Sequence, residues 1–146
     1  MDEANLALLK RSWRRLAPLC SILGPIFHGR LLASAPHLRP LFAAGQFAEL
    51  IDILAVVVEA SGREAGRVSL HRLGRRHAAH DIRPADYDAL GEALFWTIET
   101  ALDGGLSEAE RRVWTIAYGV VRDEMLRGAV DRVPTAAAHD ASDLVV

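Results

Sequence analysis

The chain contains 146 residues, of which 51% are hydrophobic, and it carries a formal net charge of −2. This length is typical of one domain with a single core, and the slightly acidic balance argues against a nucleic-acid binder, whose surface is usually clearly basic. The single cysteine excludes an internal disulfide and argues against a thiolate zinc site.

The N-terminal sequence MDEANLALL is acidic and lacks the basic segment and the long apolar core of a signal peptide. The longest apolar run, residues 53–58, is far too short to span a bilayer. We therefore expect a cytoplasmic protein that has no membrane partner.

Apolar residues at helical spacing predict that the first part of the chain is helical. One apolar face over residues 6–16 indicates a first helix, which Pro18 is expected to end. Pro25 is predicted to open a second helix, because a first turn does not need the donor that proline lacks. Residues 35–42 contain two prolines four positions apart and favour a tight turn or a single-turn helix.

The middle of the chain continues this pattern. A strong apolar stripe over residues 47–58 predicts a helix that is buried on most sides. Residues 61–66 are polar, contain two glycines and are predicted to form a loop. Leu70, Leu73 and His77 then resume the helical spacing.

Two further helices are predicted before the chain ends. The first has Pro84 in its first turn and ends at the Asp-Gly-Gly sequence 103–105. The second begins at the Ser-Glu-Ala-Glu sequence 107–110, which has the spacing of a capping box, and continues to about Gly128. The whole pattern predicts one all-α domain over residues 1–130, followed by a flexible C-terminal tail at 131–146.

Three of the six histidines lie between residues 71 and 81. His71 and His77 are about 120° apart on a helical wheel and cannot bind one ion from the same helix. His77 and His80 share a face and could form a metal pair, although no third ligand is identifiable nearby and the neighbouring arginines would repel a cation.

Three arginines in the same segment, Arg72, Arg75 and Arg76, could contact the phosphates of a nucleic acid. No aromatic residues are interleaved with them for stacking, so an exposed helix with solvated histidines is the simpler interpretation. His77 differs because it extends the apolar stripe that precedes it and is expected to point inward. Its spacing leaves open whether it is a hydrogen-bonded core residue or a ligand.

Four stretches resemble the bacterial single-domain haemoglobins, a group of globins related to the haem domain of flavohaemoglobins. They are LKRSWRRLAPL (9–19), IFHGRLLASAPHLRPLF (26–42), LHRLGRRHAAHDIRPADYDALGEAL (70–94) and LSEAERRVWTIAYGVVRDEM (106–125). The third is the most specific, because it fixes a histidine ten residues before a tyrosine. The resemblance implies a globin fold of six to seven helices that encloses a haem pocket.

The resemblance places the iron-ligating histidine of the family at His77, whose neutral imidazole would bind the iron of haem b (iron protoporphyrin IX). Tyr87 matches a tyrosine that relatives pair with this histidine. Relatives complete the pair with a glutamate, and counting from Tyr118 puts that position at Ala129. Without this carboxylate, the histidine is expected to donate electrons less strongly to the iron.

Other residues are expected to line the haem by the same resemblance. Phe27 and Leu73 are apolar candidates, and Phe42 matches the phenylalanine that wedges against the macrocycle. Arg76, Arg72 or Arg75 could pair with the haem propionates, and the sequence does not choose between them.

On the distal side, Gln46 matches the polar residue above the iron, and its amide could donate a hydrogen bond to a bound gas. Leu50, one turn later, matches the apolar residue that limits the pocket. The segment after Phe42 is shorter than in relatives, so Gly45 or Phe47 could take the position of Gln46.

His28 stands where the family usually has a tyrosine that contacts the bound ligand. It could pack in the core, donate a hydrogen bond to a ligand, or bind the iron itself opposite His77. The third possibility would produce a six-coordinate haem protein for electron transfer or for redox or gas sensing.

The function implied by the resemblance is reversible binding of dioxygen, nitric oxide or carbon monoxide at a haem held by His77. Nitric oxide dioxygenation is an enzymatic alternative, and it would require a separate reductase because the chain has no reductase domain. A haem-free interaction domain is the remaining alternative, against which His77 argues. We expect no nucleic-acid partner.

Overall fold

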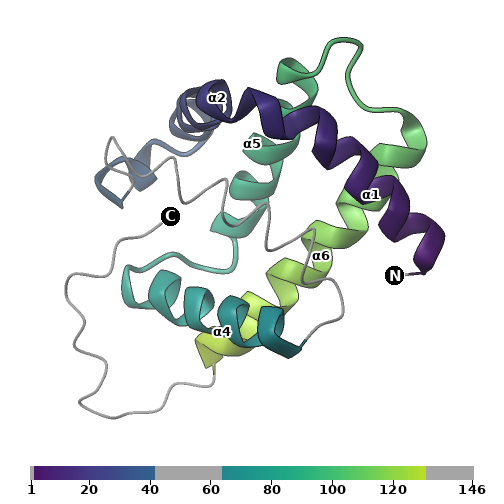
Figure 1. Ribbon diagram of the computed structural model, residues 1–146. Coiled ribbons are helices and arrows are strands. Elements are labelled where there is room, and N and C mark those ends of the chain that lie inside the picture. The colour runs from purple at the N-terminus through teal and green to yellow at the C-terminus, as the bar shows by residue number, and fades with distance from the viewer. Residues whose placement is uncertain (1, 42–63, 131–146) are drawn as a thin grey trace.

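The computed structural model describes residues 2–41 and 64–130, and all regular structure within these ranges is helical. In chain order the elements are α1 (Glu3–Leu16), η1 (Ala17–Leu19), α2 (Cys20–Ser34), η2 (Pro36–Leu41), α4 (Glu64–Ala79), α5 (Asp86–Ala101) and α6 (Glu108–Val130), shown in Figure 1. None of these helices is by itself long and apolar enough to cross a membrane, and only the bent pair α1–α2 meets that test when its two arms are joined.

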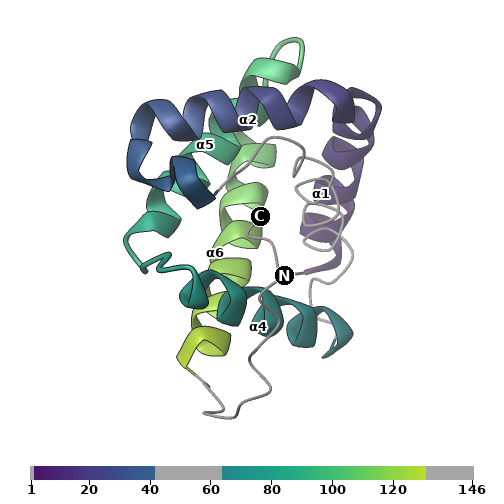
Figure 2. The same cartoon turned by 90° about the vertical axis from the view of Figure 1, so that its left-hand side faces the viewer.

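The helices pack in two main pairs. α4 packs most extensively against α6, α2 packs against α5, and α1 packs against α6. Figures 1 and 2 show that the α2–α5 contact and the α4–α6 contact lie at opposite ends of the molecule. One apolar core joins all five helices, and its buried residues include Leu9, Leu16, Leu23, Phe27, Leu31, Leu70, Leu73, Leu90, Leu94, Ile98, Val113, Trp114 and Met125.

Two polar contacts fix α1 on α6. The indole N–H of Trp114, which is fully buried, donates to Ser12 Oγ at 2.8 Å, and that hydroxyl donates to the Leu9 carbonyl oxygen. Arg15 donates to both carboxylate oxygens of Glu110, at 2.9 and 3.1 Å. Each buried polar atom in this seam therefore has a partner, as burial requires.

Glu110 also belongs to the predicted capping box, which the structure confirms. Its backbone N–H donates to Ser107 Oγ at 3.1 Å, and the Ser107 backbone N–H donates to Glu110 Oε2 at 2.8 Å. Burial by itself would raise the pKa of Glu110, but the hydrogen bond from the Ser107 backbone and the ion pair with Arg15 outweigh it, so the pKa is lowered. The ionised carboxylate is therefore the form that stabilises the fold.

We expect Glu110→Gln to lower the free energy of unfolding by about 2 kcal/mol at neutral pH, because hydrogen bonds to a charged group are lost. The folded-state pKa is lowered, so this contribution is present above the ordinary value of 4.5 and is lost as the pH falls through the lowered value. Urea unfolding at pH 7 and at pH 3 should therefore show a gap between variant and wild type that narrows in acid.

Glu99→Gln is the matched control, because Glu99 pairs with Arg111 at a solvent-exposed site. Loss of this ion pair should lower the free energy of unfolding by less than about 1 kcal/mol. The stabilising role of ionised Glu110 would be contradicted if both variants lowered the free energy of unfolding equally. It would also be contradicted if the loss in Glu110→Gln did not depend on pH.

The prediction that Pro25 opens the second helix is wrong. α2 begins at Cys20, and Pro25 lies inside it. Proline removes one backbone hydrogen bond from a helix interior, but Leu23 and Leu31, on either side of it, are fully buried. Burial of this face holds the helix together across the proline, so tertiary packing overrides the local signal.

Other predicted boundaries also shift. Residues 64–66, predicted as part of a loop, form the first turn of α4, and Gly66 is buried there. α5 begins at Asp86 rather than at Pro84, and α6 continues past Gly128 to Val130. The predicted tight turn at 35–42 corresponds to η2, and the predicted helix over 47–58 and the tail at 131–146 lie outside the described residues.

Candidate functional site

His77 lies in the last turn of α4 and is only 3% exposed, so the inward orientation predicted from the apolar stripe is confirmed. Its carbonyl oxygen accepts hydrogen bonds from the backbone N–H groups of His80 and Ile82. Between these two, Asp81 adopts the left-handed conformation with φ of 60°. This geometry ends the helix at Ala79, two residues after His77, and returns Ile82 to the core.

The structure brings His77 and Tyr87 together, as the resemblance predicts. His77 Nδ1 lies 3.3 Å from the Tyr87 hydroxyl oxygen, and the ring centroids are 5.8 Å apart at an angle of 47°. Burial raises the pKa of Tyr87 to about 12, so its hydroxyl keeps its proton at neutral pH. A partner at Nδ1 fixes both the tautomer and the orientation of an imidazole ring.

The start of α5, where Tyr87 lies, is anchored by Asp86. The Asp86 carboxylate accepts from the Arg83 backbone N–H at 2.9 Å and lies 2.8 Å from His37 Nε2 on η2. Burial would raise the pKa of Asp86, but the Arg83 backbone and His37 outweigh it, and the pKa is lowered. This contact joins residues 49 positions apart, which is why no local sequence pattern predicts it.

Tyr118 of α6 is a second residue that the sequence analysis assigned no role in the site. Its hydroxyl donates to the carbonyl oxygen of Tyr87 at 2.5 Å. Its ring lies against Gly91, where a Cβ atom would be only 2.6 Å from Tyr118 Cε1. Burial, followed by the neighbouring Tyr87, raises the pKa of Tyr118. A glycine inside a helical pattern is the sequence signal for such a close approach.

Two glycines set the register between α4 and α6. A Cβ at Gly74 would come within 3.0 Å of the Met125 backbone, and a Cβ at Gly128 equally close to the His71 backbone. The two helices therefore run antiparallel. Ala129, counted as the position of the family glutamate, thus lies beside the turn of α4 that holds His71. That turn is about 9 Å along the helix from His77, so the sequence count does not put Ala129 opposite His77.

The other two histidines of the cluster bind elsewhere. His71 Nε2 lies 2.7 Å from Glu124 Oε2 on α6, and the hydrogen bond from His71 lowers the pKa of Glu124. His80, just beyond the end of α4, has its Nδ1 2.9 Å from the carbonyl oxygen of Arg76 in the last turn of that helix. Within residues 2–41 and 64–130, no three His, Cys, Asp or Glu side chains are grouped to hold a metal ion. The three histidines thus do not form one site.

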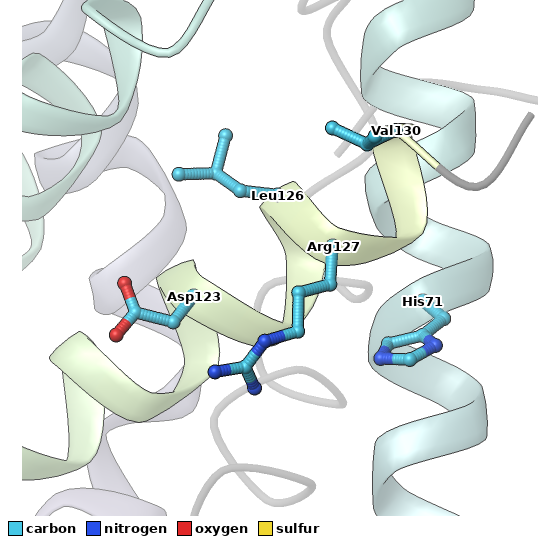
Figure 3. A pocket seen from close by; sticks show the side chains of 5 residues that line it. All are labelled: His71, Asp123, Leu126, Arg127 and Val130. Atoms are coloured by element: carbon cyan, nitrogen blue, oxygen red, sulfur yellow. The ribbon is translucent and has the colours of Figure 1, made fainter.

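A pocket of about 610 Å³ lies at the C-terminal end of α6 (Figure 3). Its described lining consists of Asp123, Leu126, Arg127 and Val130 from α6 and His71 from α4. This lining includes neither His77 nor Tyr87, so the pocket is separate from the candidate site.

The remaining predicted site residues differ in burial. Phe27 and Leu73 are buried in the common core, while His28 on α2 and Arg76 on α4 are half-buried. Arg72 and Arg75 are exposed. The predicted distal residues Phe42, Gln46 and Leu50 lie outside the described residues.

Comparison with known proteins identifies the family. The globin family model matches residues 27–125, which is more than half of the chain. Neuroglobin from Tetraodon nigroviridis is 25% identical, and neuroglobin from Danio rerio is 23% identical; each comparison covers 88% of this chain and 92% of the relative. The solved globin domain of HGbRL in its closed form is 24% identical, with 89% of this chain and 97% of that chain covered and a TM-score of 0.43.

The family model spans the part of the chain that contains Phe27, His77, Tyr87 and Tyr118. The described fold is all-helical, as a globin fold requires. The chain therefore belongs to the globin family, whose members bind haem and gases.

Proposed function

We propose that this globin holds haem b with His77 as the axial ligand of the iron and reversibly binds dioxygen or another diatomic gas. The observation that carries the proposal is the state of His77 itself. It is a 3% exposed histidine on the apolar face of α4, and its Nδ1 lies within hydrogen-bonding distance of a buried tyrosine hydroxyl. An imidazole oriented through Nδ1 is prepared to ligate a metal through Nε2.

The chemistry of the donor set fits haem. Iron in a globin needs one imidazole nitrogen, the macrocycle needs apolar contacts, and the propionates need cations or other donors. His77 supplies the nitrogen, and the buried Leu73, four residues earlier on the same helix, supplies apolar surface. When bound, haem supplies the iron atom at which a gas binds.

The residues of this chain hold and orient the ligating histidine. In the tautomer that leaves Nε2 to the iron, His77 Nδ1–H donates to the Tyr87 hydroxyl oxygen, which strengthens electron donation from the imidazole. Among the three arginines of α4, we assign the propionate contact to Arg76. It is half-buried and directly precedes His77, whereas Arg72 and Arg75 face solvent.

A six-coordinate haem, with His28 opposite His77, is the second candidate, and the half-burial of His28 beside Phe27 supports it. The helix of His28, α2, lies at the opposite end of the molecule from α4 (Figure 2). A protein of this kind would serve electron transfer or redox sensing, and gas would bind only after His28 leaves the iron. Nitric oxide dioxygenation with a separate reductase stays a prediction of the sequence resemblance.

The absorption spectrum of the haem-supplied protein tests both candidates. We expect a Soret band, and in the reduced, ligand-free state a single broad visible band that changes when carbon monoxide is added. Two sharp visible bands would instead indicate six-coordinate iron, and His28→Leu should then convert them to the broad band. His71→Gln is the control, since His71 already binds Glu124, and it should leave either spectrum unchanged. The absence of a Soret band after haem supply would refute haem binding.

A further inference from the structure

The Tyr118 side chain packs against the second turn of α5, at Gly91. This contact is possible because residue 91 is glycine: a Cβ there would lie 2.6 and 2.9 Å from two atoms of the Tyr118 ring. Phe95, one turn later on α5, meets the same ring edge-on, with centroids 6.2 Å apart and an interplanar angle of 77°. Steric contact from two sides therefore fixes the ring.

The fixed position of the Tyr118 ring places its hydroxyl against the backbone of Tyr87. The Tyr118 hydroxyl donates to the Tyr87 carbonyl oxygen at 2.5 Å, across 31 positions of sequence. Tyr87 is the second residue of α5, where a helix is prone to fray. A side-chain donor at this carbonyl limits that movement, and with it the movement of the Tyr87 side chain.

The same helix, α6, also fixes the other member of the pair. Gly74 of α4 lies against the backbone of Met125, two turns along α6 from Tyr118, and His77 follows Gly74 by three residues. α6 therefore contacts α4 close to His77 and contacts α5 at Tyr87. The separation of 3.3 Å between His77 Nδ1 and the Tyr87 hydroxyl depends on both contacts.

We propose that Tyr118 is a positioning residue for His77, because its hydroxyl and its seat on Gly91 hold the Tyr87 hydroxyl against His77 Nδ1. This inference rests on the proposed function, in which His77 binds the haem iron. Tyr118 itself does not touch the ligating imidazole in this scheme. It acts by keeping the partner of Nδ1 in place, and so it tunes how strongly the histidine donates to the metal.

Resonance Raman spectroscopy of the reduced, ligand-free haem protein measures this effect through the iron–imidazole stretching frequency. Tyr118→Phe keeps the ring on Gly91 and removes only the hydroxyl. We expect it to shift the band to lower frequency, in the same direction as Tyr87→Phe, because a weaker bond at Nδ1 lowers imidazole donation. In the Tyr87→Phe background, Tyr118→Phe should cause no further shift, since the group through which it acts is gone.

Thr115→Val is the matched control. Thr115 is another α6 hydroxyl that donates to a backbone carbonyl, that of Arg111, but it is exposed. Its loss should leave the band in place. Thermal unfolding of each haem protein separates a local change from a global loss of stability, which by itself would not shift the frequency of the folded molecules.

Two outcomes would overturn the inference: an unshifted band in Tyr118→Phe while Tyr87→Phe shifts it, or shifts from the two variants that add in full. Failure of the proposed function looks different. If His77 does not bind the haem iron, the wild-type protein would lack an iron–imidazole band, or would have one that persists in His77→Gly.

Discussion

His77→Gly is expected to raise the dissociation constant for haem by more than about 100-fold, because the loss of a mere outer-sphere partner of a metal ligand already costs about 10- to 100-fold. The substitution removes the axial nitrogen and leaves an opening where the imidazole had been. It also removes the partner of the buried Tyr87 hydroxyl. The measurement is a haem titration followed at the Soret band, together with haem transfer to a scavenger protein.

Added imidazole distinguishes a lost ligand from a lost fold. In His77→Gly, free imidazole can enter the vacated space and should restore the spectrum and part of the affinity. His80→Gly is the control just beyond the end of α4, because the His80 ring lies 2.9 Å from the Arg76 carbonyl oxygen and not beside Tyr87. Full haem occupancy and an unchanged spectrum in His77→Gly would contradict the central assignment, whatever the control shows.

Helical periodicity predicts most of the described fold, and the reason is physical. Each helix must bury one face, so its apolar residues recur at the helical repeat and can be recognised without any knowledge of neighbours. The capping box at Ser107 and Glu110 is equally local and is confirmed. Predictions failed where packing outweighs a local signal: α2 continues through Pro25 because the face that carries Leu23 and Leu31 is buried.

In the candidate site too, features that depend on local sequence were predicted and features that depend on helix packing were not. The stripe on α4 correctly predicts that His77 points inward, and the resemblance correctly pairs it with Tyr87. The seating of Tyr118 on Gly91 could not be predicted, because it depends on how α5 and α6 cross. Gly91 and Tyr118 are 27 positions apart, and a single sequence does not indicate which distant residues are in contact. Gly128 lies near the end of α6, as expected, but its packing against the His71 backbone of α4 was not predicted.

Gly74→Ala is expected to destabilise the fold by about 3 kcal/mol, at the upper end of the usual range for overpacking. The added methyl would lie within 3.0 Å of the backbone O, C and Cα atoms of Met125. A backbone cannot rotate away as a side chain can, so α4 must move off α6. The gain in helix propensity from alanine, about 1 kcal/mol, offsets only part of this cost. Urea unfolding of the haem-free protein measures it directly.

Gly119→Ala is the control on α6, because a Cβ at Gly119 would meet nothing within 4 Å. There alanine should stabilise the protein by about 0.5–1 kcal/mol. If both substitutions raised the free energy of unfolding by a similar amount, the close crossing of α4 and α6 would be refuted.

The Gly74→Ala variant also tests whether this crossing positions the histidine. His77 follows Gly74 by three residues, so a displaced α4 carries His77 away from Tyr87. Haem affinity should therefore fall together with stability in Gly74→Ala, and added imidazole should not restore it, because the native imidazole still occupies the space. In His77→Gly the crossing is intact and imidazole rescue should succeed. The contrast between the two variants separates the ligand from the framework that holds it.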